Sequence, residues 1–268
     1  MIGALEYEFM RNAVIAGLLA SIACGSIGSF IVVKRLVSLS GGIAHASFGG
    51  IGLGYFLKVN PIFGAVLFAL GSALGIGYIS KRAAGREDTA IGILWSLGMA
   101  VGIILIGLTP GYAPDLFSYL FGSILTVPRS DLLLIAGLDV IVFIVISVLY
   151  KELLAVSFDE EFALIIGIPV NRLYFLILCL TALTVVVLIR IVGIILVIAL
   201  LTIPAAISEL YIHNLKTIIL SSIALSVLFT FTGLWLSYIF DLASGAMIIV
   251  TASSAFFIAF LYKILSNR

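Results

Sequence analysis

One histidine lies in a segment made almost entirely of small residues. The segment reads Ser38-Leu-Ser-Gly-Gly-Ile-Ala-His-Ala-Ser-Phe-Gly-Gly-Ile-Gly52 and contains His45. On a helix, residues three and four positions away share a face, so His45 is flanked mainly by glycine. A histidine at membrane depth normally faces a bundle interior or an aqueous path, and neutral imidazole is a common metal ligand. The segment therefore indicates either a polar group on an aqueous path or a histidine hydrogen-bonded to a neighbouring helix.

A second candidate is an acidic segment that ends in a helix stop. It reads Ser157-Phe-Asp-Glu-Glu-Phe-Ala-Leu-Ile-Ile-Gly-Ile-Pro-Val-Asn-Arg172. Ser157 or Asp159 can cap a helix, acids fill its first turn, and Gly167 with Pro169 ends it. The pattern predicts a short amphipathic helix that either docks into a partner's groove or lies on the protein's own membrane face. Its apolar residues are Phe158, Phe162, Ile165 and Ile166.

Three isolated charges fall inside or beside apolar runs: Asp139, Arg190 and Glu209. Such a charge is a functional hypothesis by default, although each can equally be paired within a bundle. The chain has no GxxxxGK[ST], HExxH or GxSxG motif, so we expect no enzyme activity from it. Its two histidines, His45 and His213, cannot form an all-histidine metal cage, and His213 reads as a loop residue.

These groups are set in a chain that is far more apolar than a soluble domain. Of its 268 residues, 63% are hydrophobic and 10% are charged, whereas soluble domains average about 45–50% apolar and about 25% charged. The surplus predicts an integral membrane protein. A net charge of +1 gives no electrostatic basis for binding nucleic acid. Cys24 and Cys179 lie in apolar runs, where packing is expected instead of a disulfide or a metal site.

Nine apolar runs approach the roughly 20 residues that a helix needs to cross a bilayer. They predict an all-α, polytopic transmembrane helical bundle with eight or nine spans. A shorter stretch, residues 116–127, is expected to be re-entrant or a connector. The nine runs cover residues 13–33, 39–57, 61–80, 90–108, 132–150, 173–189, 191–208, 218–239 and 243–262.

The basic residues predict the orientation, because cytoplasmic loops retain Lys and Arg. An external N-terminus leaves only Arg11, Lys58, Arg129 and Arg190 outside or within the membrane. The C-terminus and the loop at about residues 151–172 are then cytoplasmic, in a multi-pass protein of the cell (plasma or inner) membrane. The residues placed inside are Lys34, Arg35, Lys81, Arg82, Arg86, Lys151, Arg172, Lys216, Lys263 and Arg268.

No soluble domain or linker interrupts the apolar runs, so residues 1–268 are predicted to form a single transmembrane domain. Glycines recur four residues apart within several runs, which favours close approach of helices. The pairs are Gly50 and Gly54, Gly71 and Gly75, and Gly98 and Gly102.

Seven short motifs follow one another along nearly the whole chain. They are Gly28-Ser-Phe-Ile-Val-Val-Lys-Arg35, Gly41-Gly-Ile-Ala-His-Ala46, Asp88-Thr-Ala-Ile-Gly92, Tyr119-Leu-Phe-Gly122, residues 157–172, Arg190-Ile-Val-Gly193 and Ile203-Pro-Ala-Ala206. Each is weak alone, but the ordered series resembles the permease subunits of ATP-binding-cassette importers for zinc, manganese and iron(II).

The resemblance implies a homodimer, or a pair of close paralogues, that works with two cytoplasmic ATPase subunits and an extracytoplasmic metal-binding protein. A divalent metal is then the transported substrate, and no cofactor is implied for this chain. The second span is expected to line the translocation path, with His45 as its wetted group and metal ligand. The other residues expected on this path are Gly41, Gly42, Ser47 and Gly49.

Residues 160–167 resemble the coupling helix of this family, which contacts the ATPase. The residues expected to make that contact are Asp159, Glu160, Glu161, Ala163, Gly167 and Pro169.

Position 42 departs from the family pattern, in which an Asp usually precedes this histidine by three residues. Gly42 removes a hard carboxylate ligand, so a solvated ion or a bulkier metal complex fits the segment as well as a bound ion does. One alternative is therefore the related permease class for iron-siderophore, haem or cobalamin. The other is an ATP-independent ion carrier that uses Asp139 and His45 as a proton relay.

Overall fold

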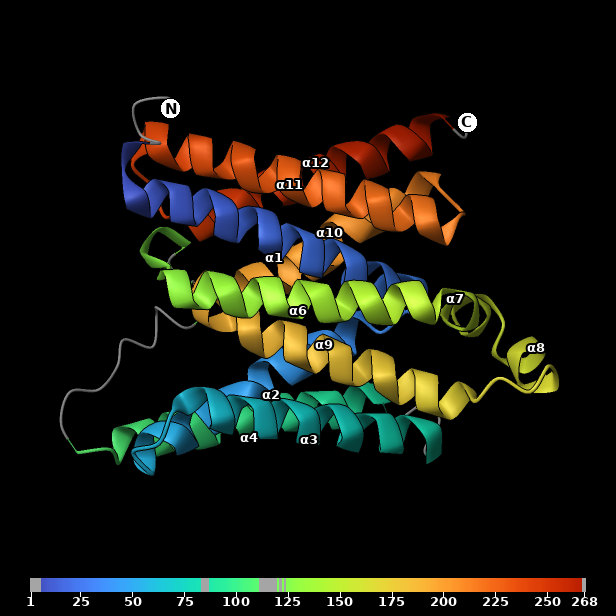
Figure 1. Ribbon diagram of the computed structural model, residues 1–268, viewed down its shortest axis with the longest axis horizontal. Helices are drawn as coiled ribbons and strands as arrows, with labels where there is room; N and C mark the ends of the chain where they lie inside the picture. Colours follow the sequence, from blue (N-terminus) through green and yellow to red (C-terminus); the bar gives the residue numbers. More distant parts are fainter. Residues whose placement is uncertain (1–5, 83–86, 111–119, 121, 123, 267–268) are drawn as a thin grey trace. The chain divides into compact units, whose positions relative to one another are not determined.

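The computed structural model describes residues 6–82, 87–110, 120, 122 and 124–266, and every regular element in these residues is a helix (Figure 1). The all-α prediction is confirmed. Eight of the helices have the length and hydropathy of membrane spans. The helices are α1 (Glu8–Val33), α2 (Val37–Phe56), α3 (Pro61–Arg82), α4 (Glu87–Gly107), the 3-10 turn η2 (Ile124–Thr126), α6 (Arg129–Val148), α7 (Tyr150–Phe158), α8 (Glu160–Ile165), α9 (Val170–Val192), α10 (Ile194–Tyr211), α11 (Leu215–Phe240) and α12 (Ser244–Ser266).

Helix α2 is a ninth long helix of 20 residues, most of them buried. Its many glycines and its histidine make it less hydrophobic than the eight spans. Half of the predicted connector at 116–127 lies outside the described residues, and the one regular element among its described residues is η2.

Two predicted boundaries shift for physical reasons. The expected break at Arg190 is wrong, because α9 continues to Val192 and the chain turns at Gly193, which has a φ of 80°. Glycine adopts this left-handed conformation without the steric cost of a Cβ, and Arg190 in the last turn complements the helix dipole. The loop predicted at about residues 151–172 is also more helical than expected, since α7 follows α6 directly after Leu149.

The chain divides into two compact units. The first unit holds residues 1–34, 117–150 and 188–268, and the second holds residues 35–116 and 151–187. Within the first unit, α1 packs against α6, α10 and α11, and α12 packs against α10 and α11. Within the second unit, α2 packs against both α3 and α4.

Buried hydroxyl groups join three helices of the first unit. The Oγ atoms of Ser29 on α1, Ser222 on α11 and Ser208 on α10 form a chain with separations of 3.2 and 3.3 Å. Ser21 and Thr230 form a second contact between α1 and α11, with their oxygens 3.3 Å apart. Hydrogen bonds between hydroxyls are a usual means of holding helices together where water is excluded.

Glycine lets the backbones of the second unit touch. A Cβ added to Gly64 on α3 would lie 2.0 Å from the carbonyl oxygen of Gly50 on α2. A Cβ added to Gly98 on α4 would lie 2.5 Å from the Cα of Ala46. Close approach is thereby confirmed for the pairs that contain Gly50 and Gly98. The prediction of close approach is wrong for Gly71 and Gly75, because no described atom of this chain would lie within 4 Å of a Cβ added at either position.

Two substitutions on α3 separate helix contact from helix propensity. Gly64→Ala should lower the free energy of unfolding by about 1–3 kcal/mol, because the added methyl collides with backbone that cannot move aside. Gly71→Ala is the matched control and should be neutral or stabilising by about 0.5–1 kcal/mol, since alanine favours the helix. Denaturant unfolding in detergent micelles measures both. Equal stability of the two variants would contradict the described contact.

Candidate functional site

His45 is held by an aromatic ring of the neighbouring helix. It lies near the middle of α2 and stacks on Trp95 of α4, with ring centroids 4.0 Å apart and planes 9° apart. His45 is partly exposed, and its Nδ1 atom is buried with no hydrogen-bond partner among the described residues. The predicted alternative of a histidine bonded to a neighbouring helix is therefore not seen at this nitrogen. Stacking fixes the plane of the imidazole ring instead.

Position 42 points into the packing between helices. A Cβ on Gly42 would lie 2.7 Å from Cγ2 of Ile91 on α4 and 3.6 Å from Cδ1 of Ile76 on α3. The branched side chain of Ile91 fills the space that a longer residue at position 42 would need. Where the family pattern has an Asp at this position, this chain therefore has an apolar contact between α2 and α4.

The remaining small residues of the predicted path are buried within the second unit. Ser47 has no exposed surface, and its hydroxyl donates to the carbonyl of Ala44 at 2.6 Å. A Cβ on Gly49 would lie 2.9 Å from Phe68, and one on Gly41 would lie 3.9 Å from Trp95. His45 is therefore the member of the predicted set that reaches the surface of this unit. Helical spacing places all five predicted path residues on one helix. It does not show which face of that helix the neighbouring helices cover.

The short helix α8 has a cap at each end. The carboxylate of Asp159 accepts a hydrogen bond from the backbone N–H of Phe162 at 2.9 Å, which confirms this residue as the N-cap. Gly167 has a φ of 83°, and its N–H bonds the carbonyl of Leu164 while that of Ile168 bonds Ala163. These two bonds form a Schellman motif, which closes a helix C-terminus.

The apolar residues around α8 face outward. Ile165 is 83% exposed, whereas Ala163 is completely buried and fastens the opposite side of the helix. An exposed apolar cluster on so short a helix is typical of a docking element. Its members, each more than half exposed, are Phe158, Phe162, Leu164, Ile165 and Ile166.

A lysine that the sequence analysis did not select connects α8 to α3. Lys81 Nζ lies 3.8 Å from the carboxylate of Glu160 and 4.7 Å from the ring centroid of Tyr174. The Tyr174 hydroxyl in turn donates to Ser80 at 3.4 Å. Both α8 and His45 belong to the second unit, and α3 contacts α2 within it. In the sequence, the one sign of this contact between α3 and α8 is the pair of basic residues at the end of α3, Lys81 and Arg82.

The three isolated charges lie in different environments of the first unit. Arg190 Nε forms an ion pair with the buried carboxylate of Asp131 at 3.2 Å. Asp139 is only 8% exposed, and neither of its oxygens has a partner among the described residues. Glu209 is exposed near the end of α10. Within the described part of the chain, no three His, Cys, Asp or Glu side chains gather to hold a metal.

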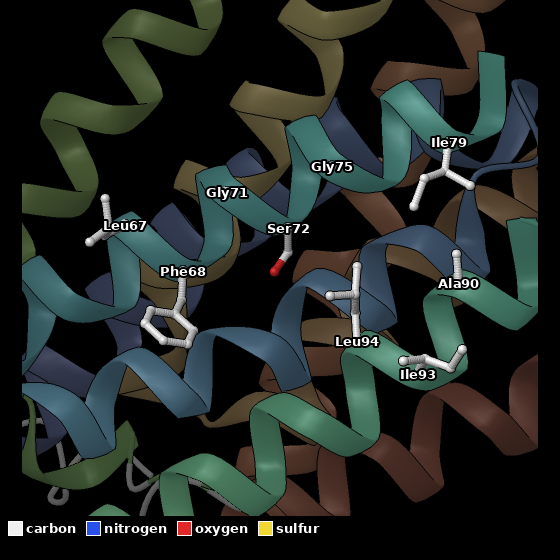
Figure 2. Close-up of a pocket in the computed structure, with 9 residues that line it drawn as sticks. All are labelled: Leu67, Phe68, Gly71, Ser72, Gly75, Ile79, Ala90, Ile93 and Leu94. Carbon is white, nitrogen blue, oxygen red and sulfur yellow. The ribbon is translucent and has the colours of Figure 1, made fainter. Parts of the chain in front are cut away.

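An apolar groove of about 610 Å³ runs between α3 and α4 (Figure 2). Ser72 points its hydroxyl into the groove, and the open glycines 71 and 75 form part of one wall. The lining holds no titratable side chain, so the groove offers neither metal ligands nor an acid or base. His45 and α8 remain the candidate functional groups of this unit.

Comparisons with known proteins extend over almost the whole chain. Residues 6–263 match the model of the ABC 3 transport family. The manganese transport system membrane protein MntC of Listeria monocytogenes is 39% identical over 97% of this chain and 92% of its own length. An uncharacterized membrane protein of Synechocystis sp. is 51% identical over 98% and 94%. The solved structure of PsaBC from Streptococcus pneumoniae in complex with Fab aligns with a TM-score of 0.87 and 36% identity, covering 97% of this chain and 94% of that one.

The cap of α8 generates a local prediction. Asp159→Ala should destabilise the helix by about 1 kcal/mol, because the N–H of Phe162 loses its acceptor. Amide hydrogen exchange over residues 162–166 should then become about fivefold faster. Glu161→Ala removes a neighbouring acid that is not the cap, and it should change this exchange much less. Identical exchange in the two variants would rule out Asp159 as the stabilising cap.

Proposed function

The chain belongs to the ABC 3 transport family, and on that premise we propose that it is the permease subunit of an ATP-binding-cassette importer for a divalent metal. The observation that carries the proposal is the exposed, doubly capped α8 in the same compact unit as His45. Relatives of similar length are named as membrane proteins of manganese transport systems, which supports manganese as the metal.

The chain works as one transmembrane domain over residues 1–268, paired with a second copy or a close paralogue. Two ATPase subunits act at the cytoplasmic face, and an extracytoplasmic binding protein delivers the metal. ATP hydrolysis belongs to a separate subunit, so this chain is not itself an enzyme. The C-terminus is cytoplasmic, in agreement with the bias of basic residues toward the side that carries α8.

Helix α8 is the element that receives force from the ATPase. Its exposed apolar residues enter a groove on that partner, while Asp159 and Gly167 keep the helix formed at its two ends. A displacement of α8 reaches α3 because Glu160 on α8 pairs with Lys81 on α3, and the ring of Tyr174 on α9 holds Lys81 in place. Because α3 contacts α2, closure of the ATPases moves the helix that holds His45 and switches access from one side to the other.

His45 is the polar group that the metal meets along the path. Manganese prefers oxygen ligands and accepts imidazole, so a single histidine binds it weakly enough for release. Trp95 holds the imidazole in one orientation without using its nitrogens. With Ile91 in the place where a carboxylate would reach, the ion keeps most of its water ligands as it passes.

Metal uptake tests the role of His45. His45→Ala should reduce ATP-dependent manganese uptake at least about tenfold, because His45 is the one member of the five predicted path residues that is partly exposed. His213→Ala changes the other histidine, which is exposed in a loop, and should leave uptake unchanged. Radioactive manganese uptake at matched membrane expression measures both. Unchanged uptake and metal preference in His45→Ala would reduce this residue to a packing role.

Association with the ATPase tests the role of α8. Ile165→Glu places a charge in the exposed apolar cluster and should weaken binding by about 30-fold, the usual cost at an interface hot spot. Val59→Glu makes the same change at a residue 53% exposed in the loop after α2, and it should bind normally. Co-purification with the ATPase from detergent extracts distinguishes the two. Full retention by Ile165→Glu would overturn the assignment of α8 as the coupling helix.

A further inference from the structure

A cavity of about 450 Å³ lies in the first unit, whereas His45 and α8, which the proposed transport uses, belong to the second. It opens where α1 and α6 begin, at one membrane edge. Its lining combines charged and apolar side chains: Glu8, Arg11, Asn12, Ile15, Arg129, Leu132 and Leu133.

The charged and apolar side chains lie at different depths. Helices α1 and α6 contact each other and run in the same direction (Figure 1). Arg11 and Ile15 are four residues apart on α1, and Arg129 and Leu133 are four apart on α6. At 1.5 Å per residue, each apolar residue lies about 6 Å farther into the membrane than its arginine. The cavity therefore has a cationic rim and an apolar floor.

The rim carries a surplus positive charge. Arg129 Nε lies 2.9 Å from the carboxylate of Glu8, which neutralises one guanidinium. Arg11 is exposed and forms no ion pair described in this part of the chain. Asn12 Nδ2 donates to the carbonyl of Val127 at 3.2 Å, which holds α1 against the segment before α6. Because both helices begin here, their dipoles add to the attraction for an anion.

We propose that this cavity binds an anionic phospholipid. The phosphodiester lies against Arg11, the rim arginine that Glu8 does not neutralise, because a planar guanidinium group suits phosphate oxygens. One acyl chain follows Ile15, Leu132 and Leu133 toward the bilayer centre. A free phosphate ion would use the rim but not the floor. A soluble protein partner would not reach Leu133, which lies about a turn inside the helix.

Lipid binding to the purified permease–ATPase complex tests the proposal. The probes are phosphatidylglycerol, phosphatidylcholine with the same acyl chains, and glycerol phosphate, measured by native mass spectrometry after delipidation. Phosphatidylglycerol should bind at least about fivefold more tightly than either of the other two. Arg11→Gln should weaken its binding by about fivefold. Leu133→Asn should also weaken it, and because Leu133 is 76% exposed we expect this variant to fold. Lys58→Gln, which removes another exposed cation, should bind phosphatidylglycerol normally.

Several results would overturn the site. Equal binding of phosphatidylglycerol to Arg11→Gln and Lys58→Gln would show that the cationic rim does not bind the lipid. Equal affinity for glycerol phosphate would show that the apolar floor has no role and that the site takes a free anion. Loss of binding-protein docking in Arg11→Gln, with unchanged lipid binding, would assign the rim to a protein contact. None of these readouts depends on metal transport, so failure here leaves the proposed function standing.

Discussion

The close contact of α2 with α3 and α4 is the constraint on which the candidate site depends. Gly50 and Gly64 bring two backbones together, and Gly98 does the same on the other side of α2. In a bilayer, apolar side chains gain little by leaving lipid, so such contacts must come from packing and close approach. They place Trp95 against His45 and leave no room for a carboxylate at Gly42. A larger residue at these glycines would move the histidine as well as the helices.

The same compact unit connects the histidine with the surface that we propose meets the ATPase. Lys81 contacts Glu160, the first residue of α8, and Tyr174 near the start of α9, so several modest interactions involve one side chain. A single half-exposed ion pair contributes little, but the buried ring of Tyr174 gives the lysine a fixed position. The first unit differs in character, because hydroxyl pairs such as Ser29 and Ser222 join its buried helices. Transport in this account is motion of helices as packed groups, without covalent chemistry in this chain.

Much of the fold could be predicted from the sequence, because membrane spans are long and their apolar runs are bounded by charges. The errors were local. The break after α9 depends on the left-handed backbone of Gly193, whereas the nearby charge of Arg190 predicts it three residues too early. The glycine pairs looked alike in the sequence, yet Gly71 and Gly75 border an open groove while Gly50 and Gly98 touch backbone.

The site was only partly accessible to the same reasoning. His45 and the cap of Asp159 could be found from residue types and spacing. The stacking of Trp95 and the bond network of Lys81 could not, because both depend on helices that are distant along the chain. Ser47 is predicted on the path because it is a polar residue close to His45 in the sequence. Its side chain is buried, and its hydroxyl hydrogen-bonds the backbone of its own helix.

We propose that this chain moves metal only when an ATPase drives it. The most direct measurement is manganese uptake into proteoliposomes that contain either the permease alone or the permease with its ATPase and binding protein. We expect no uptake above background for the permease alone, and accumulation against a gradient only when ATP and both partners are present. Equal uptake by the permease alone, without ATP, would contradict the account and identify an autonomous ion carrier.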